Sequence, residues 1–249
     1  FNCDLAQSYG IYSNDSEFRL LDYVTSANIS CGFHAGDPLL IREYLLKCKE
    51  NNLTIGAHIG FNDLHGLGYR PMELSPDEIE AIVLYQVGAL ASFAKAYGLE
   101  IDHVRPHGAM YKLASENYDF SLSIARAIQK FDKWLSYTCL DNQILENVSA
   151  ETGILIRREV FVDKPYTPDF QVDWNADRYI NDDDALNRIR TIMFSSQIKL
   201  GNGLFMPVNC DTIHFDTKNP NIENILKKAN EIVIPTPPNY NKAEESGWV

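Results

Sequence analysis

The sequence lacks the cysteine patterns of secreted and zinc-thiolate proteins. Its 249 residues include five cysteines at wide spacings, and no CxxC pair occurs. We therefore expect neither a disulfide framework nor a zinc-thiolate site, and a reducing, cytoplasmic compartment is the natural interpretation. The sequence also has no run of 18 apolar residues, so no membrane-spanning helix is expected.

Positive charge is also scarce. Lys and Arg total 22 against 34 Asp and Glu, which gives a formal net charge of −12. Nucleic acids and anionic membranes both require a positively charged surface on their partners. We therefore expect neither as a partner, although a local pocket can carry either sign.

Several common nucleotide and hydrolase motifs are missing. No G-x-G-x-x-G or Walker motif occurs, which weakens a nucleotide-binding fold, and there is no H-E-x-x-H zinc motif. No G-x-S-x-G elbow occurs either, which argues against a Ser-His-Asp triad.

Apolar runs alternate with helical patterns along most of the chain. A capping box at Ser75–Glu78 opens a long helix that ends near Gly98. Strands are predicted at Phe1–Leu5, Val24–Ile29, Thr54–His58, His103–Pro106, Leu135–Leu140, Ile154–Val162 and Asp211–Phe215, with a hairpin at Ile198–Val208. Further helices are predicted at Leu39–Cys48, Ser115–Phe131, Asn142–Glu151, Asp182–Ser195 and Asn221–Ala229.

This alternation predicts a parallel sheet with helices outside it. Seven strands suit either a barrel or a doubly wound sheet. Polar motifs at the strand ends favour the barrel, because barrel enzymes carry their catalytic residues at the C-terminal ends of strands. We expect one (β/α) barrel domain over residues 1–249, with a loosely packed tail from Pro235.

The first motif is Asn2-Cys3-Asp4. In a strand, Asn2 and Asp4 point to the same side. Two polar groups on one side of a core strand are costly unless they are hydrogen-bonded or used by a ligand. The alternative is a surface edge strand.

The second motif is the segment Ser26–Pro38, whose small residues and two glycines allow close approach of a ligand. Asn28 and His34 are its candidate binding groups. Asp37 precedes Pro38 at a predicted helix start, so it either caps that helix or contacts a ligand.

Two further motifs end predicted strands. His58 lies within Gly56–Gly60, and His107 lies within Arg105–Tyr111, with Tyr111 four residues later. Arg70, in the loop after His58, either binds an anionic substrate group or is a solvated loop charge.

Histidines and a carboxylate at several strand ends suit two chemistries. Asp4, His58 and His107 could hold a divalent metal, since imidazole and carboxylate suit zinc or iron. They could instead perform general acid–base catalysis, since His titrates near neutral pH. The spacing alone does not choose between these.

The ordered segments NCDL, SANISCGFHAGDP, IGAHIGFNDLHGLGYRPM, YQVGAL and HVRPHGAMY closely resemble the LamB/YcsF family. The resemblance resumes at EVFVDKPYTPD (Glu159–Asp169). It implies a deformed (β/α)7 TIM-like barrel related to polysaccharide deacetylases. It also implies opening of the lactam of 5-oxo-L-proline to L-glutamate with ATP hydrolysis, together with partner subunits B and C.

The resemblance implies roles for the motif residues. Asp4, His58 and His107 are the preferred catalytic residues, and these three would also be the ligands of any metal. Residues placed around them for substrate binding are Asn2, Asn28, His34, Asp37, Arg70 and Tyr111.

The chain departs from the family pattern in three places. Gln7 stands where the family usually has Glu, and Asp211–Asp216 stands where it usually has V-H-G-D. Here either His214 and Asp216 act as replacements or the family histidine is lost. Gln171–Arg178 replaces a third family segment.

Three functions fit these residues. The first is one component of an ATP-dependent lactam hydrolase that works with partner subunits. The second is a stand-alone, metal-dependent, deacetylase-like hydrolase with Asp4, His58 and His107 around one metal. The third is a non-catalytic family member with a ligand pocket or scaffold role, which Gln7 and the altered Asp211–Asp216 segment suggest.

Overall fold

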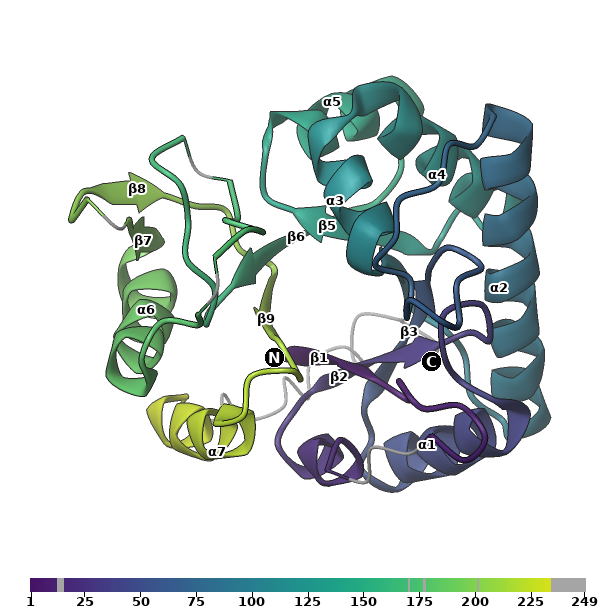
Figure 1. The fold of residues 1–249 in the computed structure, drawn as a ribbon, viewed down its shortest axis with the longest axis horizontal. Coiled ribbons are helices and arrows are strands. Elements are labelled where there is room, and N and C mark those ends of the chain that lie inside the picture. Colours follow the sequence, from purple (N-terminus) through teal and green to yellow (C-terminus); the bar gives the residue numbers. More distant parts are fainter. Residues whose placement is uncertain (13–15, 170, 177, 201, 234–249) are drawn as a thin grey trace, which may run out of the picture.

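The computed structural model describes residues 1–12, 16–169, 171–176, 178–200 and 202–233. Within this part of the chain, seven parallel strands close into a barrel in the order β1-β2-β3-β4-β5-β6-β9 (Figure 1). The predicted (β/α)7 TIM-like barrel is therefore confirmed, and pairing of β9 with β1 excludes the open doubly wound sheet. The predicted tail from Pro235 lies outside the described residues, so one domain over residues 1–249 stays a prediction.

The predicted elements agree with the observed ones apart from small shifts at their ends. The barrel strands are β1 (Asn2–Leu5), β2 (Ser26–Ser30), β3 (Thr54–Ile59), β4 (His103–Pro106), β5 (Ser136–Leu140), β6 (Ile156–Phe161) and β9 (Thr212–Phe215). The helices are η1 (Phe18–Asp22), α1 (Pro38–Glu50), α2 (Pro76–Ala96), α3 (Gly108–Glu116), α4 (Tyr118–Phe131), α5 (Gln143–Thr152), α6 (Asp182–Ser195) and α7 (Ile222–Ile232). The hairpin is β7 (Gln197–Lys199) and β8 (Phe205–Pro207).

The start of one predicted helix was wrong, and the short helices η1 and α3 were not predicted. The segment Ser115–Phe131 is not continuous, because Asn117 adopts an extended conformation between α3 and α4. Its side chain accepts a hydrogen bond from the Phe120 amide and so caps α4. Helix α3 begins at Gly108, so His107 is its N-cap residue.

Helix α2 begins at the predicted capping box and packs on α1, α4 and β3. It is long and apolar enough to span a membrane by length and composition alone, but here its apolar side covers the barrel. Gln86, the polar residue in its buried stripe, exchanges hydrogen bonds of 2.8 and 3.0 Å with the backbone of Gly60. The pair fixes the end of β3 beside His58.

The barrel interior is polar, unlike the branched apolar layers that commonly fill such barrels. Alternation along the strands directs Cys3 and Leu5 outward and Asn2 and Asp4 inward. Glycine makes room for these inward groups, since a Cβ on Gly56 would lie 2.1 Å from Nε2 of His103. The inward polar side chains are Asn2, Asp4, Asn28, His103, Arg105, Glu159 and His214.

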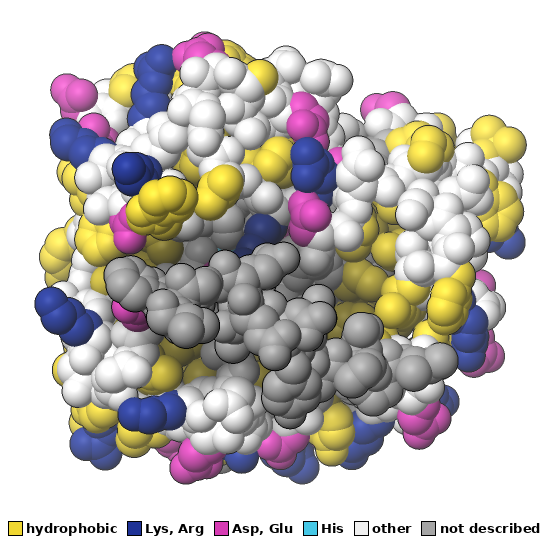
Figure 2. Space-filling model, turned by 180° about the vertical axis from the view of Figure 1, so that it is seen from behind, with side chains coloured by type: hydrophobic (Ala, Val, Ile, Leu, Met, Phe, Trp, Pro, Cys, Tyr) yellow, Lys and Arg dark blue, Asp and Glu magenta, His cyan; other side chains and the backbone are white. Residues whose placement is uncertain are grey.

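Acidic and basic side chains are interspersed on the face of the molecule shown in Figure 2. Hydrophobic side chains gather at the side formed by α6 and the β7–β8 hairpin. Phe194, Leu204 and Phe205 are exposed there.

Candidate active site

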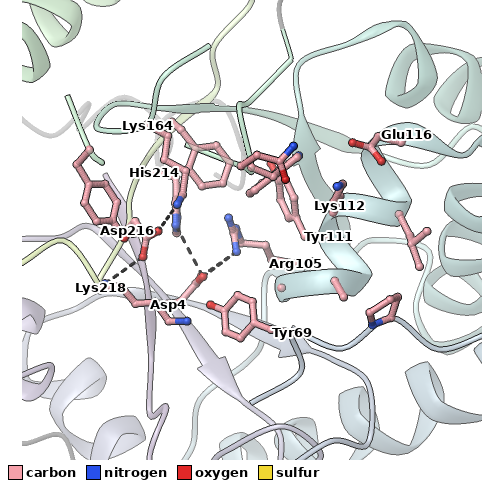
Figure 3. A pocket seen from close by; sticks show the side chains of 18 residues that line it. Asp4, Tyr69, Arg105, Tyr111, Lys112, Glu116, Lys164, His214, Asp216 and Lys218 are labelled. Atoms are coloured by element: carbon pink, nitrogen blue, oxygen red, sulfur yellow. Dashed lines mark hydrogen bonds and ion pairs between the residues drawn. The ribbon is translucent and has the colours of Figure 1, made fainter. Parts of the chain in front are cut away.

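A cavity of about 590 Å³ lies at the C-terminal ends of the barrel strands. Asp4 of β1, Arg105 of β4 and His214 of β9 form its floor (Figure 3). Its walls come from α3 and from the loops that follow β3, β6 and β9. The wall residues are Tyr69, Pro71, Gly108, Ala109, Tyr111, Lys112, Leu113, Glu116, Phe161, Lys164, Trp174, Asn175, Tyr179, Asp216 and Lys218.

Asp4 is the carboxylate of the cavity floor. Its Oδ1 accepts hydrogen bonds from Arg105 Nη1 (2.9 Å) and Asn28 Nδ2 (3.1 Å), and its Oδ2 lies 3.2 Å from His58 Nε2. Burial raises the pKa of Asp4, but the charge of the Arg105 guanidinium outweighs burial and holds this pKa well below its usual range. Asp4 is therefore ionised at neutral pH.

Arg105 is a buried cation between two carboxylates. It donates to both oxygens of Asp4 and, through Nε and Nη2, to Glu159 at 2.7–3.0 Å. Arg105 is 2% exposed and Glu159 is fully buried. Neither residue was predicted from the sequence as a site residue. The available signal was spacing, because His103, Arg105 and His107 alternate along one strand and share its inward side.

His34, His58 and His107 gather behind Asp4, all of them buried. His58 Nε2 lies 2.9 Å from His107 Nδ1. The His34 ring is stacked on that of His107 at 4.1 Å between centroids and 7° between planes. The structure thus brings the three predicted histidines together beside Asp4, although they do not line the cavity.

The ring orientations decide which of these residues could hold a metal. A metal ligated by imidazole lies in the plane of the ring, along the nitrogen lone pair. Two stacked, parallel rings share no such point, so His34 and His107 do not fit one ion in this arrangement. The rings of His58 and His107 cross at 84°, and His58 Nε2 lies 2.9 Å from His107 Nδ1 and 3.2 Å from Asp4 Oδ2, so Asp4, His58 and His107 are the better ligand set.

Hydrogen bonds fix the protons of His58 and His107. His58 Nδ1 lies 3.2 Å from the carbonyl oxygen of Arg105, and His107 Nε2 lies 2.7 Å from that of Leu67. Carbonyl oxygens only accept, so both of these nitrogens carry hydrogen. His107 Nδ1 then presents a lone pair to His58 Nε2, and the Asp4 carboxylate lies 3.2 Å from that same nitrogen, so two acceptors converge on His58 Nε2.

Both His34 and His107 are neutral on electrostatic grounds. Burial lowers the pKa of His107 to about 3, with His58 contributing. Burial, followed by His107 and His58, holds the pKa of His34 well below its usual range. Neither imidazole is therefore a proton donor to substrate.

His214 is the histidine that lines the cavity. The Asn2 amide nitrogen donates to Glu159 and Thr212, so the Asn2 Oδ1 atom is the acceptor that faces His214. His214 Nδ1 therefore carries hydrogen and donates it to Asn2 Oδ1 (2.7 Å). Burial, followed by the charge of Arg105, lowers the pKa of His214, so the ring is neutral. Its Nε2 then presents a lone pair 3.7 Å from Asp4 Oδ2, at the cavity floor.

The altered segment Asp211–Asp216 therefore supplies two cavity residues, His214 and Asp216. Asp216 Oδ2 lies 2.7 Å from Lys164 Nζ and accepts a hydrogen bond of 3.1 Å from the Tyr179 hydroxyl (Figure 3). The sequence indicated this pair only as replacements for a family motif. The pairing of β9 with β1 brings these two residues to the cavity.

Four other predicted binding residues have different places. Asn28 Nδ2 donates to Asp4 Oδ1 (3.1 Å) and to Asn2 Oδ1 (2.8 Å), so Asn28 orients Asp4 directly and Asn2 holds Asn28. Tyr111 lines the cavity, with its ring centroid 4.5 Å from the guanidinium carbon of Arg105. Asp37 caps α1 through the amides of Leu39 and Leu40, at 2.9 and 3.1 Å, and does not line the cavity.

Arg70 and Gln7 also lie outside the cavity lining. Arg70 pairs with Asp63 of its own loop, with its side chain 66% exposed. The Gln7 amide donates to the Asp4 carbonyl oxygen (3.1 Å) and to Thr217 Oγ1 (2.7 Å). Gln7 thus ties the end of β1 to the loop after β9, and no carboxylate is needed for these two bonds.

Comparison with known proteins agrees with this geometry. The chain is 38% identical over 222 residues to the 5-oxoprolinase A subunit of Pyrococcus horikoshii, covering 88% of this chain and 87% of that protein. It is 36% identical over 237 residues to the protein of the same name from Staphylococcus epidermidis, covering 93% and 94%.

Solved structures also resemble this one. The lactam utilization protein from Thermus thermophilus has a TM-score of 0.86 at 33% identity, covering 93% of this chain and 95% of that one. A putative cellobiose-phosphate cleavage protein from Enterococcus faecalis has a TM-score of 0.52 at 12% identity, which shows a shared fold alone. The LamB/YcsF family model matches residues 1–234, and the chain belongs to the LamB/YcsF family.

Proposed function

We propose that this chain is the A subunit of an ATP-dependent 5-oxoprolinase, which opens the lactam ring of 5-oxo-L-proline to L-glutamate. The observation that carries the proposal is the pair of Asp4 and His214 at the floor of the cavity, in a chain whose relatives bear that name. ATP and partner subunits B and C complete the reaction. We place the complex in the cytoplasm, where ATP is available and where five free cysteines stay reduced.

Ring opening requires a base, and the site offers one. Water adds to the lactam carbonyl carbon, the bond from that carbon to the ring nitrogen breaks, and the nitrogen gains a proton. His214 Nε2 accepts a proton from the attacking water and returns it to the leaving nitrogen. Asn2 holds the tautomer that this role needs, through its hydrogen bond to Nδ1.

Asp4 and Arg105 set the electrostatics of this step. The carboxylate of Asp4 stabilises the imidazolium that forms when His214 accepts the proton. Arg105 keeps Asp4 ionised and in place.

ATP transfers its terminal phosphoryl group to the lactam oxygen and leaves as ADP, which makes the ring carbon a better electrophile than that of a stabilised amide. Water addition and cleavage of the carbon–nitrogen bond then give an acyl phosphate, and a second water releases inorganic phosphate and L-glutamate. Because the sequence has no phosphate-binding glycine motif, we assign that activation to the complex rather than to this cavity.

A second candidate is metal-dependent hydrolysis. It is favoured by His58 Nε2, which lies 2.9 Å from His107 Nδ1 and 3.2 Å from Asp4 Oδ2. Asp4 Oδ2, His58 Nε2 and His107 Nδ1 would hold a divalent ion. Such an ion supplies Lewis-acid polarisation of the carbonyl and a more acidic bound water. Elemental analysis of purified protein, with activity measured before and after chelation, separates this candidate from metal-free acid–base catalysis.

The experiment for the main proposal uses the complex of this chain with its cognate subunits B and C. We expect L-glutamate to form from 5-oxo-L-proline only when ATP and all three subunits are present. We expect Asp4→Asn to lower kcat by about 100-fold or more, the usual scale of losing one group that stabilises charge in the transition state. Absence of glutamate from the wild-type complex, while a relative's complex is active in parallel, refutes the substrate.

A further inference from the structure

One wall of the cavity is made of three aromatic rings that pack edge to face. Tyr111 of α3, Phe161 at the end of β6 and Trp174 of the following loop have ring centroids 5.6–5.8 Å apart. All three line the cavity. The wall stands directly on the cavity floor, because the guanidinium of Arg105 lies against the rings of Tyr111 and Phe161.

This wall carries two buried hydrogen-bond donors. The Tyr111 hydroxyl and the Trp174 indole Nε1 are shielded from solvent, and neither makes a hydrogen bond of normal geometry with the described residues, although the Glu159 carboxylate lies near the Tyr111 hydroxyl. Buried polar groups in native proteins are nearly always paired, so such exceptions indicate a site completed by water or a ligand. Burial, followed by Glu159, holds the pKa of the Tyr111 hydroxyl well above its usual range, so it stays a neutral donor.

We propose that Trp174 Nε1 and the Tyr111 hydroxyl form a subsite that donates hydrogen bonds to oxygen atoms of the lactam substrate. This inference rests on the proposed function. 5-Oxo-L-proline is a small ring with apolar methylene faces and two kinds of oxygen acceptor, its carboxylate and its lactam oxygen. A cavity wall made of aromatic residues with two unpaired donors matches both properties, since the rings can contact the methylenes and the donors can bind oxygen.

Trp174 comes from a segment that lacks one of the usual sequence motifs of the family. It lies in Gln171–Arg178, where this chain departs from the usual family pattern. The role of Trp174 is therefore argued from its contacts with Tyr111 and Phe161. It makes the loop after β6 a determinant of substrate affinity.

The test uses the complex with subunits B and C and the variants Trp174→Phe and Tyr111→Phe. Each variant keeps an aromatic ring and removes one donor. We expect KM for 5-oxo-L-proline to rise about 3- to 10-fold in each, the effect of one neutral hydrogen bond. An unchanged kcat identifies the carboxylate as the acceptor, and a kcat that falls as well identifies the lactam oxygen. The control is Trp134→Phe, since Trp134 is 73% exposed and precedes β5, away from the cavity.

Direct binding separates failure of this inference from failure of the proposed function. Titration of the full chain with 5-oxo-L-proline is followed by tryptophan fluorescence and calorimetry. We expect a fluorescence change that Trp134→Phe retains and Trp174→Phe loses, with weaker binding in both donor variants. Binding and KM within twofold of wild type in both donor variants would overturn the subsite even if the complex makes glutamate. Glutamate formation by the wild-type complex tests the function separately.

Discussion

Replacement of Arg105 with methionine removes the cation that lies between Asp4 and Glu159. Methionine fills a similar volume, so the change is mainly one of charge and hydrogen bonding. Both carboxylates then remain in the barrel, where burial raises their pKa values and Arg105 no longer opposes it. Removing one partner of a buried ion pair costs about 3–5 kcal/mol. That is a large part of the roughly 5–15 kcal/mol by which a domain is typically stable.

The loss of stability caused by Arg105→Met depends on pH, and its direction follows from the pKa values of the two carboxyl groups in the folded and unfolded protein. In the wild type the pKa of Asp4 is depressed, so its stabilising contribution is present above the unfolded pKa and is lost as pH falls through the folded one. In Arg105→Met the folded-state pKa values of the two carboxyls lie above their unfolded values. The variant therefore loses stability as pH rises above about 4. The difference in free energy of unfolding between the proteins should grow from about pH 4.5 to about pH 8.

Urea denaturation followed by circular dichroism at these two pH values measures the difference. Arg105→Lys is the control, since it keeps the charge and loses the two-pronged hydrogen bonding. The double variant Arg105→Met/Glu159→Gln should lose less than the sum of the single losses, because one of the stranded carboxylates is gone. An equal loss at both pH values, or strict additivity in the double variant, would show that Arg105 does not stabilise the barrel through these two charges.

Three further predictions concern residues away from the catalytic pair. Burial, followed by Asp216, raises the pKa of Asp163 to about 7. Asp163 therefore binds a proton more tightly in the folded protein than in the unfolded chain, and the stability of the fold decreases as pH rises from about 4 to 7. Asp163→Asn should raise the free energy of unfolding by about 2–4 kcal/mol at about pH 8 and change it little at about pH 4, as measured by urea denaturation; an equal gain at both values contradicts this. Asp37→Ala should cost about 1 kcal/mol of stability and leave KM unchanged, since Asp37 caps α1; a raised KM with normal stability would instead indicate ligand contact. Arg70→Ala should leave KM within twofold of wild type, because Arg70 pairs with Asp63 outside the cavity; a large rise in KM would mean that this pair opens for substrate.

The barrel and the first half of the site could be predicted from sequence for a physical reason. Parallel strands of a barrel end on one face, so polar motifs at successive strand ends converge. Asp4, His58 and His107 meet in this way. The capping box of α2 could also be predicted, because the hydrogen bonds that define it are local in sequence.

The second half of the site depends on contacts between distant segments. Glu159 reaches Arg105, 54 residues earlier, and His214 reaches Asn2, 212 residues earlier. No local pattern encodes these pairings, which follow from the closure of the barrel by β9. The two roles of Asp37 could not be separated for a related reason: the sequence shows a cap, but only the fold shows that the cap lies outside the cavity lining.

The proposed mechanism depends on His214 accepting the proton of the attacking water at the cavity floor. The most direct test is kcat for L-glutamate formation by the complex carrying His214→Gln, at saturating 5-oxo-L-proline and ATP. His65→Gln serves as the control, because His65 lies exposed in the loop after β3. We predict that kcat falls by at least about 100-fold in His214→Gln and stays at the wild-type value in the control. A His214→Gln complex that keeps wild-type kcat would show that His214 is not the base.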